Sequence, residues 1–309
     1  MALDETTTLS IVELAIYTTL VPFTFYLFFK HGLRSTLGYL YLFAFESLRI
    51  VAAILQIAAH SNHHHGGTST TGSIVSSVGL SPLILALSGF IYEFSSCTHL
   101  HHSGHRHPHA LQQQVHRSGN SDRDRRLLIV QEVLVHLGAY TGIALAATGA
   151  SNLAKSTVTP SEIDHARTLL ETGIVLILVT WIGQVYMFFR LCQKLDSLGP
   201  VSVLLGVACL FVGVRCIYSV VYAFDHSPSV NPLTGKFAIK VTLVFLVQLV
   251  AVSALLAVGF LTRNIVIVRE NNEVRRRWTL RGREDHGERY LHRPVEIESG
   301  PPIPLRSPK

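Results

Sequence analysis

Hydrophobic stretches separated by polar segments recur seven times along the chain. Each stretch has about 20 residues, which is the length that a helix needs to cross the hydrocarbon core of a bilayer. We therefore predict an all-α, polytopic membrane protein. Its seven transmembrane helices are expected at residues 9–29, 36–59, 73–96, 127–149, 169–189, 201–224 and 238–262.

The polar segments complete the expected domain organisation. Residues 1–8 form a short N-terminal segment, and residues 9–262 form the seven-helix transmembrane domain. Residues 97–126 form the longest loop, which is rich in histidine and lacks an apolar period, so we expect it to be largely disordered. Residues 263–309 form a charged tail that we also expect to be disordered.

Three prolines refine the expected helices. Pro22 and Pro82 lie inside predicted spans and are expected to kink them, which a membrane protein tolerates where neighbouring helices satisfy the freed carbonyl groups. Pro200 precedes the sixth span and suits the first position of a helix.

The composition agrees with the membrane class. Charged residues make up only 15% of the 309 residues, whereas a soluble domain has about 25%. The seven spans and the tail use up the length, so no large soluble domain is expected. The polar first eight residues lack the basic start of a cleaved signal peptide. An integral protein of the plasma membrane or of an endomembrane is therefore predicted.

Basic residues are distributed unevenly between alternate loops. The first, third and fifth loops and the tail together carry 20 Lys and Arg residues, whereas the N-terminal segment and the other loops carry three. Because positive charge in short loops marks the cytoplasmic side, we predict that the N-terminus is outside or lumenal and that the C-terminus is cytosolic.

Ionisable residues inside the predicted spans are the first candidates for a functional site, because each costs at least ~2.5 kcal/mol to insert at mid-bilayer. Glu46 and Arg49 are three residues apart on the second span, so they share a helix face and can pair. Arg215 lies in the sixth span. Counted from the cytosolic end, Arg49 and Arg215 lie about 20 and 22 Å deep, which predicts a shared layer with one positive charge in surplus.

Two interpretations of this layer remain open. The residues can form a buried ion-pair network that fixes the helix register, or they can line an outward-facing polar cavity that binds an anionic or polar ligand. Glu13 and Glu171, each near the outer end of its span, are the candidate acids that would balance the surplus charge.

A second polar pair lies on the fourth span. Glu132 and His136 are four residues apart and therefore share a face, where they can form a hydrogen-bonded couple, a proton relay or half of a metal site. On the same helix, Gly138 and Gly142 form a small-residue face for close contact with another helix of the chain or of a second copy.

The His-rich loop suggests metal binding, because imidazole is a ligand for zinc, copper and nickel. Its candidate ligands are His99, His101, His102, His105, His107 and His109. The alternative is a solvated loop with adventitious metal affinity, since no facing pair of metal ligands is evident inside the spans. No cofactor is expected.

The basic tail begins close to the membrane, where each Arg or Lys adds about 1 kcal/mol of attraction to anionic lipid. Contact of the tail with anionic lipid is therefore a possible partner interaction beside the bilayer itself. Nucleic-acid binding is not expected of a tail that is tied to a bilayer.

The second, sixth and seventh spans resemble an uncharacterised family of fungal seven-transmembrane proteins that carry a domain of unknown function. The resemblance covers roughly residues 10–262, outside the His-rich loop and the tail. Its best marks are Leu48-Arg49-Ile50, Gln56, Arg215, Ile217-Tyr218-Ser219 and Asn231-Pro232. It implies a fungal integral membrane protein and assigns no activity. A shorter likeness around Arg215 to the fungal lipid-translocating exporters suggests transport.

Three functional hypotheses follow. The first is a non-enzymatic, receptor-like sensor with a polar cavity around Glu46, Arg49 and Arg215. The second is a transporter or lipid translocator that uses the same residues as its substrate path. The third is a metal-dependent membrane hydrolase, for which one histidine within the spans, His136, is too few.

Overall fold

A computed structural model of the protein describes residues 5–31, 36–61, 80–104, 114–153, 159–193, 199–225 and 237–263. These residues belong to one compact unit, Met1–Arg263. Beyond Arg263, the predicted charged tail coincides with a second unit, Asn264–Lys309, which lies outside the described residues, so its expected disorder is not tested.

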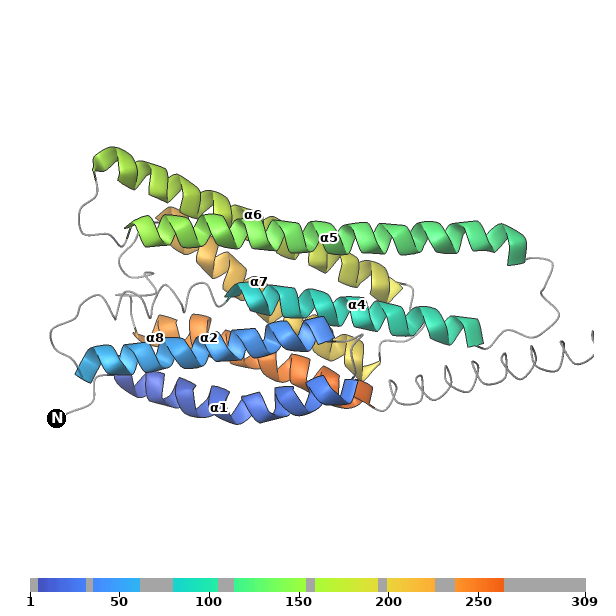
Figure 1. Ribbon diagram of the computed structural model, residues 1–309, viewed down its shortest axis with the longest axis horizontal. Coiled ribbons are helices and arrows are strands. Elements are labelled where there is room, and N and C mark those ends of the chain that lie inside the picture. The colour runs from blue at the N-terminus through green and yellow to red at the C-terminus, as the bar shows by residue number, and fades with distance from the viewer. Residues whose placement is uncertain are drawn as a thin grey trace, which may run out of the picture. The chain divides into compact units, whose positions relative to one another are not determined.

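The described part of the chain is entirely helical (Figure 1). Its elements are α1 (Glu5–His31), α2 (Thr36–Ser61), α4 (Leu80–Gly104), α5 (Gln114–Leu153), α6 (Pro160–Gln193), α7 (Pro200–Asp225), α8 (Phe237–Ile239) and η2 (Lys240–Leu246). The last two elements open a continuous last helix, Phe237–Arg263. The prediction of an all-α fold is confirmed for these residues.

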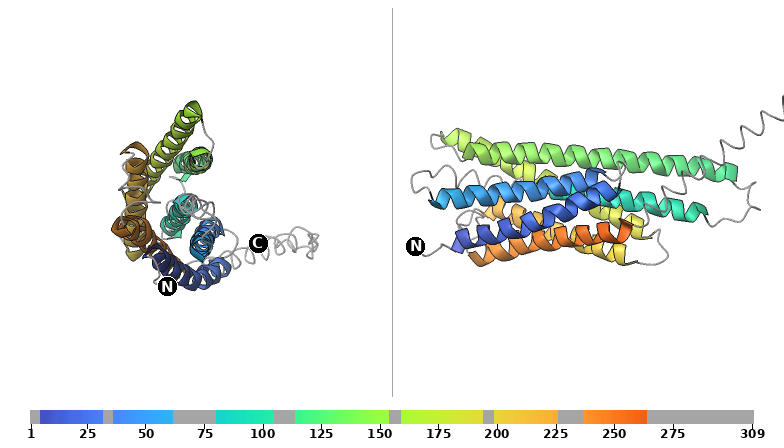
Figure 2. Two further views of the ribbon diagram at one scale, coloured as in Figure 1. Left: turned by 90° about the vertical axis from the view of Figure 1, so that its left-hand side faces the viewer. Right: turned by 60° about the horizontal axis from the view of Figure 1, so that its bottom comes forward.

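The central helix of the unit is α4. It packs against α2, α5, α6 and α7, and Figures 1 and 2 show it between them. Its first turns are buried on every side, because Leu83, Ile84, Leu85, Ala86 and Leu87 are each at most 2% exposed. A helix that is apolar all round belongs in such a buried position.

Six helices in the described part are long and apolar enough to cross a membrane. They are Glu5–His31, Leu37–Ala59, Val130–Leu153, Pro160–Gln193, Pro200–Asp225 and Phe237–Arg263. The predicted third span coincides with α4, whose apolar part, Leu80–Ser95, is shorter. The rest of that predicted span, residues 73–79, lies outside the described residues. Six candidate spans are thus found where seven were predicted.

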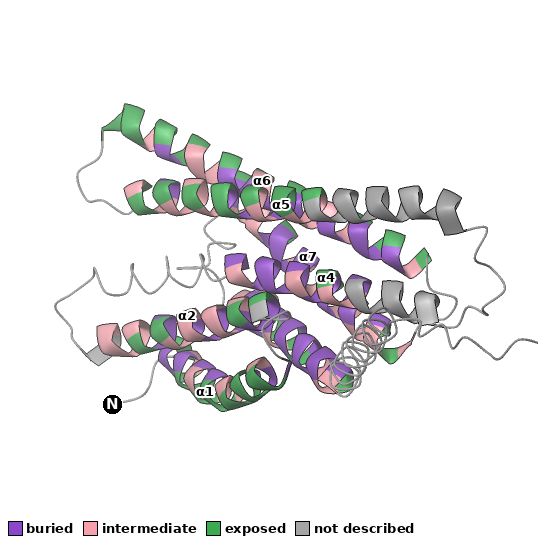
Figure 3. Ribbon diagram, turned by 45° about the vertical axis from the view of Figure 1, so that its right-hand side comes forward, coloured by how far each residue is buried: buried purple, intermediate pink, exposed green. Residues whose placement is uncertain are grey.

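Large apolar side chains point away from the neighbouring helices on α1, α5 and α6. Phe29, Leu137 and Phe189 are 70%, 61% and 59% exposed, and Figure 3 shows exposed residues along these helices. In water such faces would form an extended apolar patch. In a bilayer they are the surface that contacts the lipid chains.

The buried face of α1 is almost entirely polar. Its buried residues are Thr7, Ser10, Glu13, Tyr17, Thr24, Leu27 and His31. Ser10 donates a 2.7 Å hydrogen bond to Gln56 on α2. At the opposite end of α1, His31 Nε2 lies 3.2 Å from the hydroxyl oxygen of Thr262 on the last helix. Polar contacts therefore hold α1 to its neighbours over its whole length.

Two helices begin where a proline allows it. The helix α6 begins at Pro160, earlier than the predicted start at residue 169. Its first turn is capped by Glu162, whose Oε2 atom accepts hydrogen bonds from the backbone nitrogen and the hydroxyl of Thr159 at 2.8 Å. The bond to the backbone nitrogen is one half of a capping box. The helix α7 begins at Pro200, as predicted. Pro82 lies in the first turn of α4, where its missing N–H breaks no helical bond, so it does not require the kink that was expected there.

The expected disordered loop at residues 97–126 is helical at both ends. The helix α4 continues to Gly104, and α5 begins at Gln114. Once an apolar span has nucleated a helix, each further residue adds a backbone hydrogen bond, so polar residues can extend the helix beyond the apolar segment.

Candidate functional site

A buried ion pair among the described residues joins α1 to α2. Arg49 Nη2 lies 2.6 Å from Glu13 Oε1, and the two side chains are 1% and 10% exposed. Glu13 was predicted only as a candidate balancing acid, but it is the ion-pair partner of Arg49. Because the two opposite charges are paired, the cost of placing each of them in this apolar environment is reduced.

Glu46 lies on the same helix as Arg49 and has a different partner. Thr24 on α1 donates a 2.7 Å hydrogen bond to Glu46 Oε1. Glu46 is fully buried, and its Oε2 atom has no hydrogen-bond partner among the described residues. Both residues that were predicted to pair locally therefore contact the polar face of α1.

Tyr17 is the residue of this group that the sequence analysis missed. It is fully buried, and the guanidinium carbon of Arg49 lies 5.7 Å from the centre of its ring. Its hydroxyl is close enough to interact electrostatically with Glu13, Glu46 and Arg49. The available signal was its spacing, since Tyr17 lies four residues after Glu13 and therefore on the same helix face.

Arg215 joins the group from α7. It is buried, its Nη1 atom donates a 2.7 Å hydrogen bond to Ser219, and its guanidinium carbon lies 5.1 Å from the centre of the Tyr218 ring. It is close enough to Arg49 for the two positive charges to repel each other. We call Glu13, Tyr17, Glu46, Arg49 and Arg215 the arginine cluster.

The formal charges of the arginine cluster balance, but the ion pairing of Arg215 is incomplete. Two arginines and two carboxylates cancel, so the surplus charge that the sequence predicted is offset by Glu13. Arg215 nevertheless has no carboxylate partner among the described residues, and its buried Nε atom has no hydrogen-bond acceptor there. Glu171, the other candidate acid, is half-buried on α6, and no described contact joins it to the cluster.

Gln248 on the last helix is a further buried polar residue near this depth. Both atoms of its amide are buried and have no partner in the part of the chain that the structure describes. Arg215 lies ten residues before the end of α7, and Gln248 lies eleven residues after Phe237. Because each helical residue rises about 1.5 Å, both residues lie about 15 Å from the same end of the unit.

The helix that carries Gln248 is irregular directly before it. The segment η2, Lys240–Leu246, is a π-helix and contacts α7. Such segments are rare and occur frequently at functional sites, because the wider turn displaces backbone carbonyl groups from their usual partners. The irregular turn and Gln248 thus lie on the last helix, which is a neighbour of the helix that carries Arg215.

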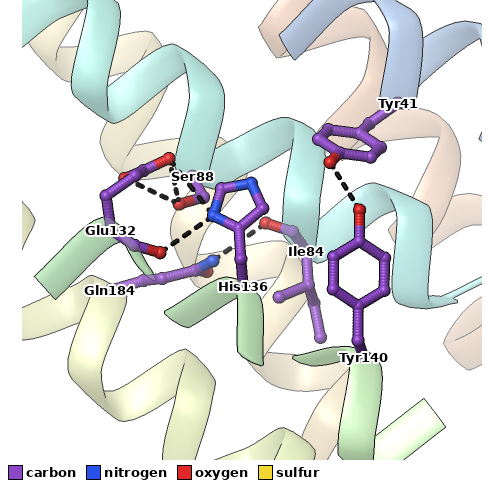
Figure 4. Close-up of polar contacts among 7 residues, drawn as sticks. All are labelled: Tyr41, Ile84, Ser88, Glu132, His136, Tyr140 and Gln184. Atoms are coloured by element: carbon purple, nitrogen blue, oxygen red, sulfur yellow. Dashed lines mark hydrogen bonds and ion pairs between the residues drawn. The ribbon is translucent and has the colours of Figure 1, made fainter. Parts of the chain in front are cut away.

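Glu132 and His136 form a second polar group, shown in Figure 4. Ser88 on α4 donates to both carboxylate oxygens of Glu132 at 3.2 Å. His136 Nδ1 lies 2.9 Å from the backbone oxygen of Glu132 and 3.5 Å from its Oε1 atom. The two residues share a face, as their spacing predicted. We call Tyr41, Ser88, Glu132, His136, Tyr140 and Gln184 the Glu132 cluster.

The predicted metal ligands of the His-rich stretch are not tested by the structure. His99, His101 and His102 belong to the helical backbone of α4. His105, His107 and His109 lie outside the described residues. Within the described part, no three His, Cys, Asp or Glu residues converge as a metal site.

The small-residue face of α5 packs within the chain. A Cβ atom on Gly142 would lie 2.9 Å from the backbone oxygen of Gly173 on α6, and one on Gly149 would lie 2.6 Å from that of Ala166. The glycines therefore allow α5 and α6 to approach closely, and the predicted contact between helices of one chain is observed.

Several apolar helices with lipid-facing sides, and buried charged groups between them, define an integral, multi-pass membrane protein. The family model for a domain of unknown function, DUF7702, matches residues 3–118 and 108–265, and the chain belongs to this family. Its matches run into the His-rich stretch, which we had expected to fall outside the resemblance. No curated protein and no solved structure matches the chain.

Proposed function

We propose that this membrane protein is a non-enzymatic, receptor-like sensor that binds a small anionic or polar ligand between α1, α2 and α7. The site would be the arginine cluster, with Arg215 as the group that contacts the ligand. Arg215 lies about 15 Å from the end of the unit where α7 ends and the last helix begins, and this depth supports entry of the ligand from that end.

The observation that carries this proposal is the incomplete pairing of Arg215. A buried guanidinium carries five N–H donors, and the described residues supply Arg215 with one hydroxyl acceptor, Ser219, and one aromatic ring, Tyr218. Charged groups within a membrane protein usually pair with one another or with a ligand. A carboxylate would supply the missing acceptors and would place a negative charge directly beside Arg215.

The proposal includes the topology that makes the site face outward. Seven spans are predicted from the apolar stretches, and the N-terminus outside with the C-terminus cytosolic from the distribution of basic residues. In this topology α4 with residues 73–79 would complete the third span. Origin in a fungus likewise stays a prediction from the resemblance.

We expect protease added to sealed cells to leave the C-terminal tail intact, because an odd number of spans puts it on the opposite side from the N-terminus. An epitope tag after Lys309, followed by immunoblotting, measures this. Permeabilised cells serve as the control, in which the tag must be lost. Loss of the tag from sealed cells would contradict the topology.

A panel of sodium carboxylates from acetate to benzoate tests the ligand site. We expect at least one of them to raise the thermal unfolding temperature of the purified protein in detergent, because a ligand that binds only the folded state stabilises it. Arg215→Gln should abolish this shift. Arg190→Gln, which changes an exposed arginine on α6, is the matched control and should retain it.

The same measurement can contradict the proposal. If none of the carboxylates shifts the unfolding temperature, or if the shift is the same in Arg215→Gln as in the wild type, Arg215 does not bind the anion. A variant that does not fold is replaced by Arg215→Lys, which keeps the charge but loses the bidentate geometry and should weaken the shift.

Transport is the second candidate, and the specific observation that favours it is η2. Irregular helices within the membrane are tolerated where they line a polar cavity, and transporters use them at substrate sites. Uptake of the stabilising carboxylate into proteoliposomes separates the two functions. Uptake that is lost in Arg215→Gln supports transport, whereas binding without uptake supports the sensor.

A further inference from the structure

The carboxyl group of Glu132 is supplied with few hydrogen-bond donors. An ionised carboxylate has about four acceptor positions. The only hydroxyl that the described residues offer it is that of Ser88, whose single proton is shared between two oxygens at 3.2 Å each. Most of the acceptor capacity of Glu132 is therefore unused, although its side chain is only 19% exposed.

His136 does not supply the missing hydrogen-bond donor to the carboxylate of Glu132. Its Nδ1 atom is nearest to the backbone oxygen of Glu132, at 2.9 Å, and lies farther, at 3.5 Å, from the carboxylate. Since a carbonyl oxygen can only accept, the proton must be on Nδ1. A neutral imidazole satisfies this contact, and its Nε2 atom then presents a lone pair with no partner in the described part of the chain.

A third unused acceptor lies one helical turn away. Gln184 on α6 is fully buried and donates a 2.9 Å hydrogen bond to the backbone oxygen of Ile84. Ile84 and Ser88 are four residues apart on α4 and thus share a face. The carbonyl oxygen of the Gln184 amide has no described donor, and Figure 4 shows this side chain on the same side of α4 as Glu132.

The group therefore contains three kinds of acceptor and lacks a matching donor. A carboxylate, an amide oxygen and an imidazole nitrogen come from α5 and α6 around Ser88. A transition metal fits this set poorly, because zinc sites use three or four nitrogen, sulfur or carboxylate ligands and only Glu132 and His136 are of these kinds. A primary ammonium group fits well, since it brings three donors and one positive charge.

The Glu132 cluster reaches an exposed part of the unit at its two tyrosines. The hydroxyl groups of Tyr41 on α2 and Tyr140 on α5 lie 2.6 Å apart, and this contact is exposed. Extensive packing joins α2 to α1 and α4, whereas α2 and α5 are not among the extensively packed helix pairs. Val133 and Leu137 on the same helix as His136 and Tyr140 are 60% and 61% exposed, so an aliphatic chain would find apolar surface on α5.

The depth of the Glu132 cluster suits a headgroup in one leaflet. Tyr41 lies five residues after the start of α2, and Gln184 lies nine residues before the end of α6. These two helix ends are on the same side of the unit, and the distances correspond to about 8 and 14 Å along the helices. That side is opposite to the end nearest Arg215.

We propose that the Glu132 cluster is a second binding site, which takes a primary ammonium group, and that the bound molecule is an amphiphile whose chain lies on the exposed face of α5. The carboxylate of Glu132 pairs with the ammonium charge, and His136 Nε2 and the Gln184 amide oxygen accept two of its hydrogen bonds. The exposed hydroxyl contact of Tyr41 and Tyr140 would border this site on the side of α2. This site is independent of the arginine cluster.

The probes for this site are dodecylamine, dodecyltrimethylammonium and dodecanol, each added to the full-length protein in detergent while thermal unfolding is followed. Dodecylamine should stabilise the protein with saturable dependence on its concentration. Dodecyltrimethylammonium has the same charge and chain but no N–H donor, and dodecanol has no charge. Both should bind at least about 10-fold more weakly, which is the loss expected for hydrogen bonds to a charged group.

Substitution of the carboxyl group provides the second measurement. Glu132→Gln should weaken dodecylamine binding about 10- to 100-fold. Asp164→Asn, which removes an exposed carboxylate from α6, should leave it unchanged. If Glu132→Gln does not fold, the comparison of the three probes on the wild type decides alone.

Equal effects of the three probes, or unchanged dodecylamine binding in Glu132→Gln, would overturn the proposal. Butylamine separates the two sources of the ammonium group. If butylamine competes only weakly, the chain contributes and the ligand is an amphiphile. If it competes as well as dodecylamine binds, the amphiphile part of the proposal is wrong and the site takes a free amine.

Discussion

Replacement of Glu13 by Gln is expected to destabilise the protein by about 3–5 kcal/mol, because it removes the carboxylate that is ion-paired with the buried charge of Arg49. The present contact is 2.6 Å long and almost fully buried. Arg49 cannot turn to the surface, because α1 and its polar face cover it. Unfolding in mixed micelles with increasing SDS measures the loss.

The charge itself, and not the packing, should cause this loss. The double variant Glu13→Leu with Arg49→Met removes both charges and keeps apolar volume, and such replacements are often close to neutral. It should therefore recover most of the stability that Glu13→Gln loses. Glu171→Gln is the matched control, since Glu171 is half-buried without a described charged partner, and it should change stability little.

A double variant that is as unstable as Glu13→Gln would show that the contact stabilises the protein through packing and not through charge. Equal stability of Glu13→Gln and the wild type would mean that Arg49 has another sufficient acceptor. Either result would remove the ion pair as the main attachment of α1 to α2, and would leave the hydrogen bonds of Ser10 and Thr24 in that role.

Gly173→Ala is expected to separate α5 from α6 and to destabilise the protein by about 1–3 kcal/mol or more, which is the usual cost of overpacking. A Cβ atom there would meet the backbone nitrogen of Ala146 and would lie 2.6 Å from the backbone oxygen of Gly142. Backbone atoms cannot rotate away as a flexible side chain does. The two helices must therefore move apart along the contact.

The same substitution elsewhere on α6 is the control. A Cβ atom on Gly183 would meet no atom within 4 Å, and alanine is favoured over glycine inside helices by about 1 kcal/mol. Gly183→Ala should therefore leave the unfolding temperature unchanged or raise it. If both alanine variants behave alike, the close approach of α5 and α6 is not required for stability.

The arginine cluster shows how far spacing alone could predict the site. The sequence placed Glu46, Arg49 and Arg215 in one layer, since helical rise fixes depth along the membrane. It also named Glu13 as a candidate acid. It did not identify Glu13 as the ion-pair partner of Arg49, because spacing along one helix cannot reveal which face of a second helix is turned toward it.

The helix α1 illustrates a related limit. Its apolar residues predicted a span, but they did not show which side was buried. In water the apolar side would face inward, whereas in lipid both the bundle and the surroundings accept apolar groups. Contacts with Gln56, Arg49 and Glu46 decide the rotation of α1, and Tyr17 consequently becomes part of the cluster.

The sequence by itself determined the membrane class, the approximate helices and the ionisable residues within them, because each depends on local composition and on the fixed length and rise of a helix. The tertiary structure decided the central position of α4, the partner of Arg49, the incomplete pairing of Arg215 and the surroundings of Glu132. These features depend on how each helix is rotated and which helices are neighbours. Close contact between small residues and the satisfaction of buried polar groups select that arrangement among many that the same apolar pattern permits.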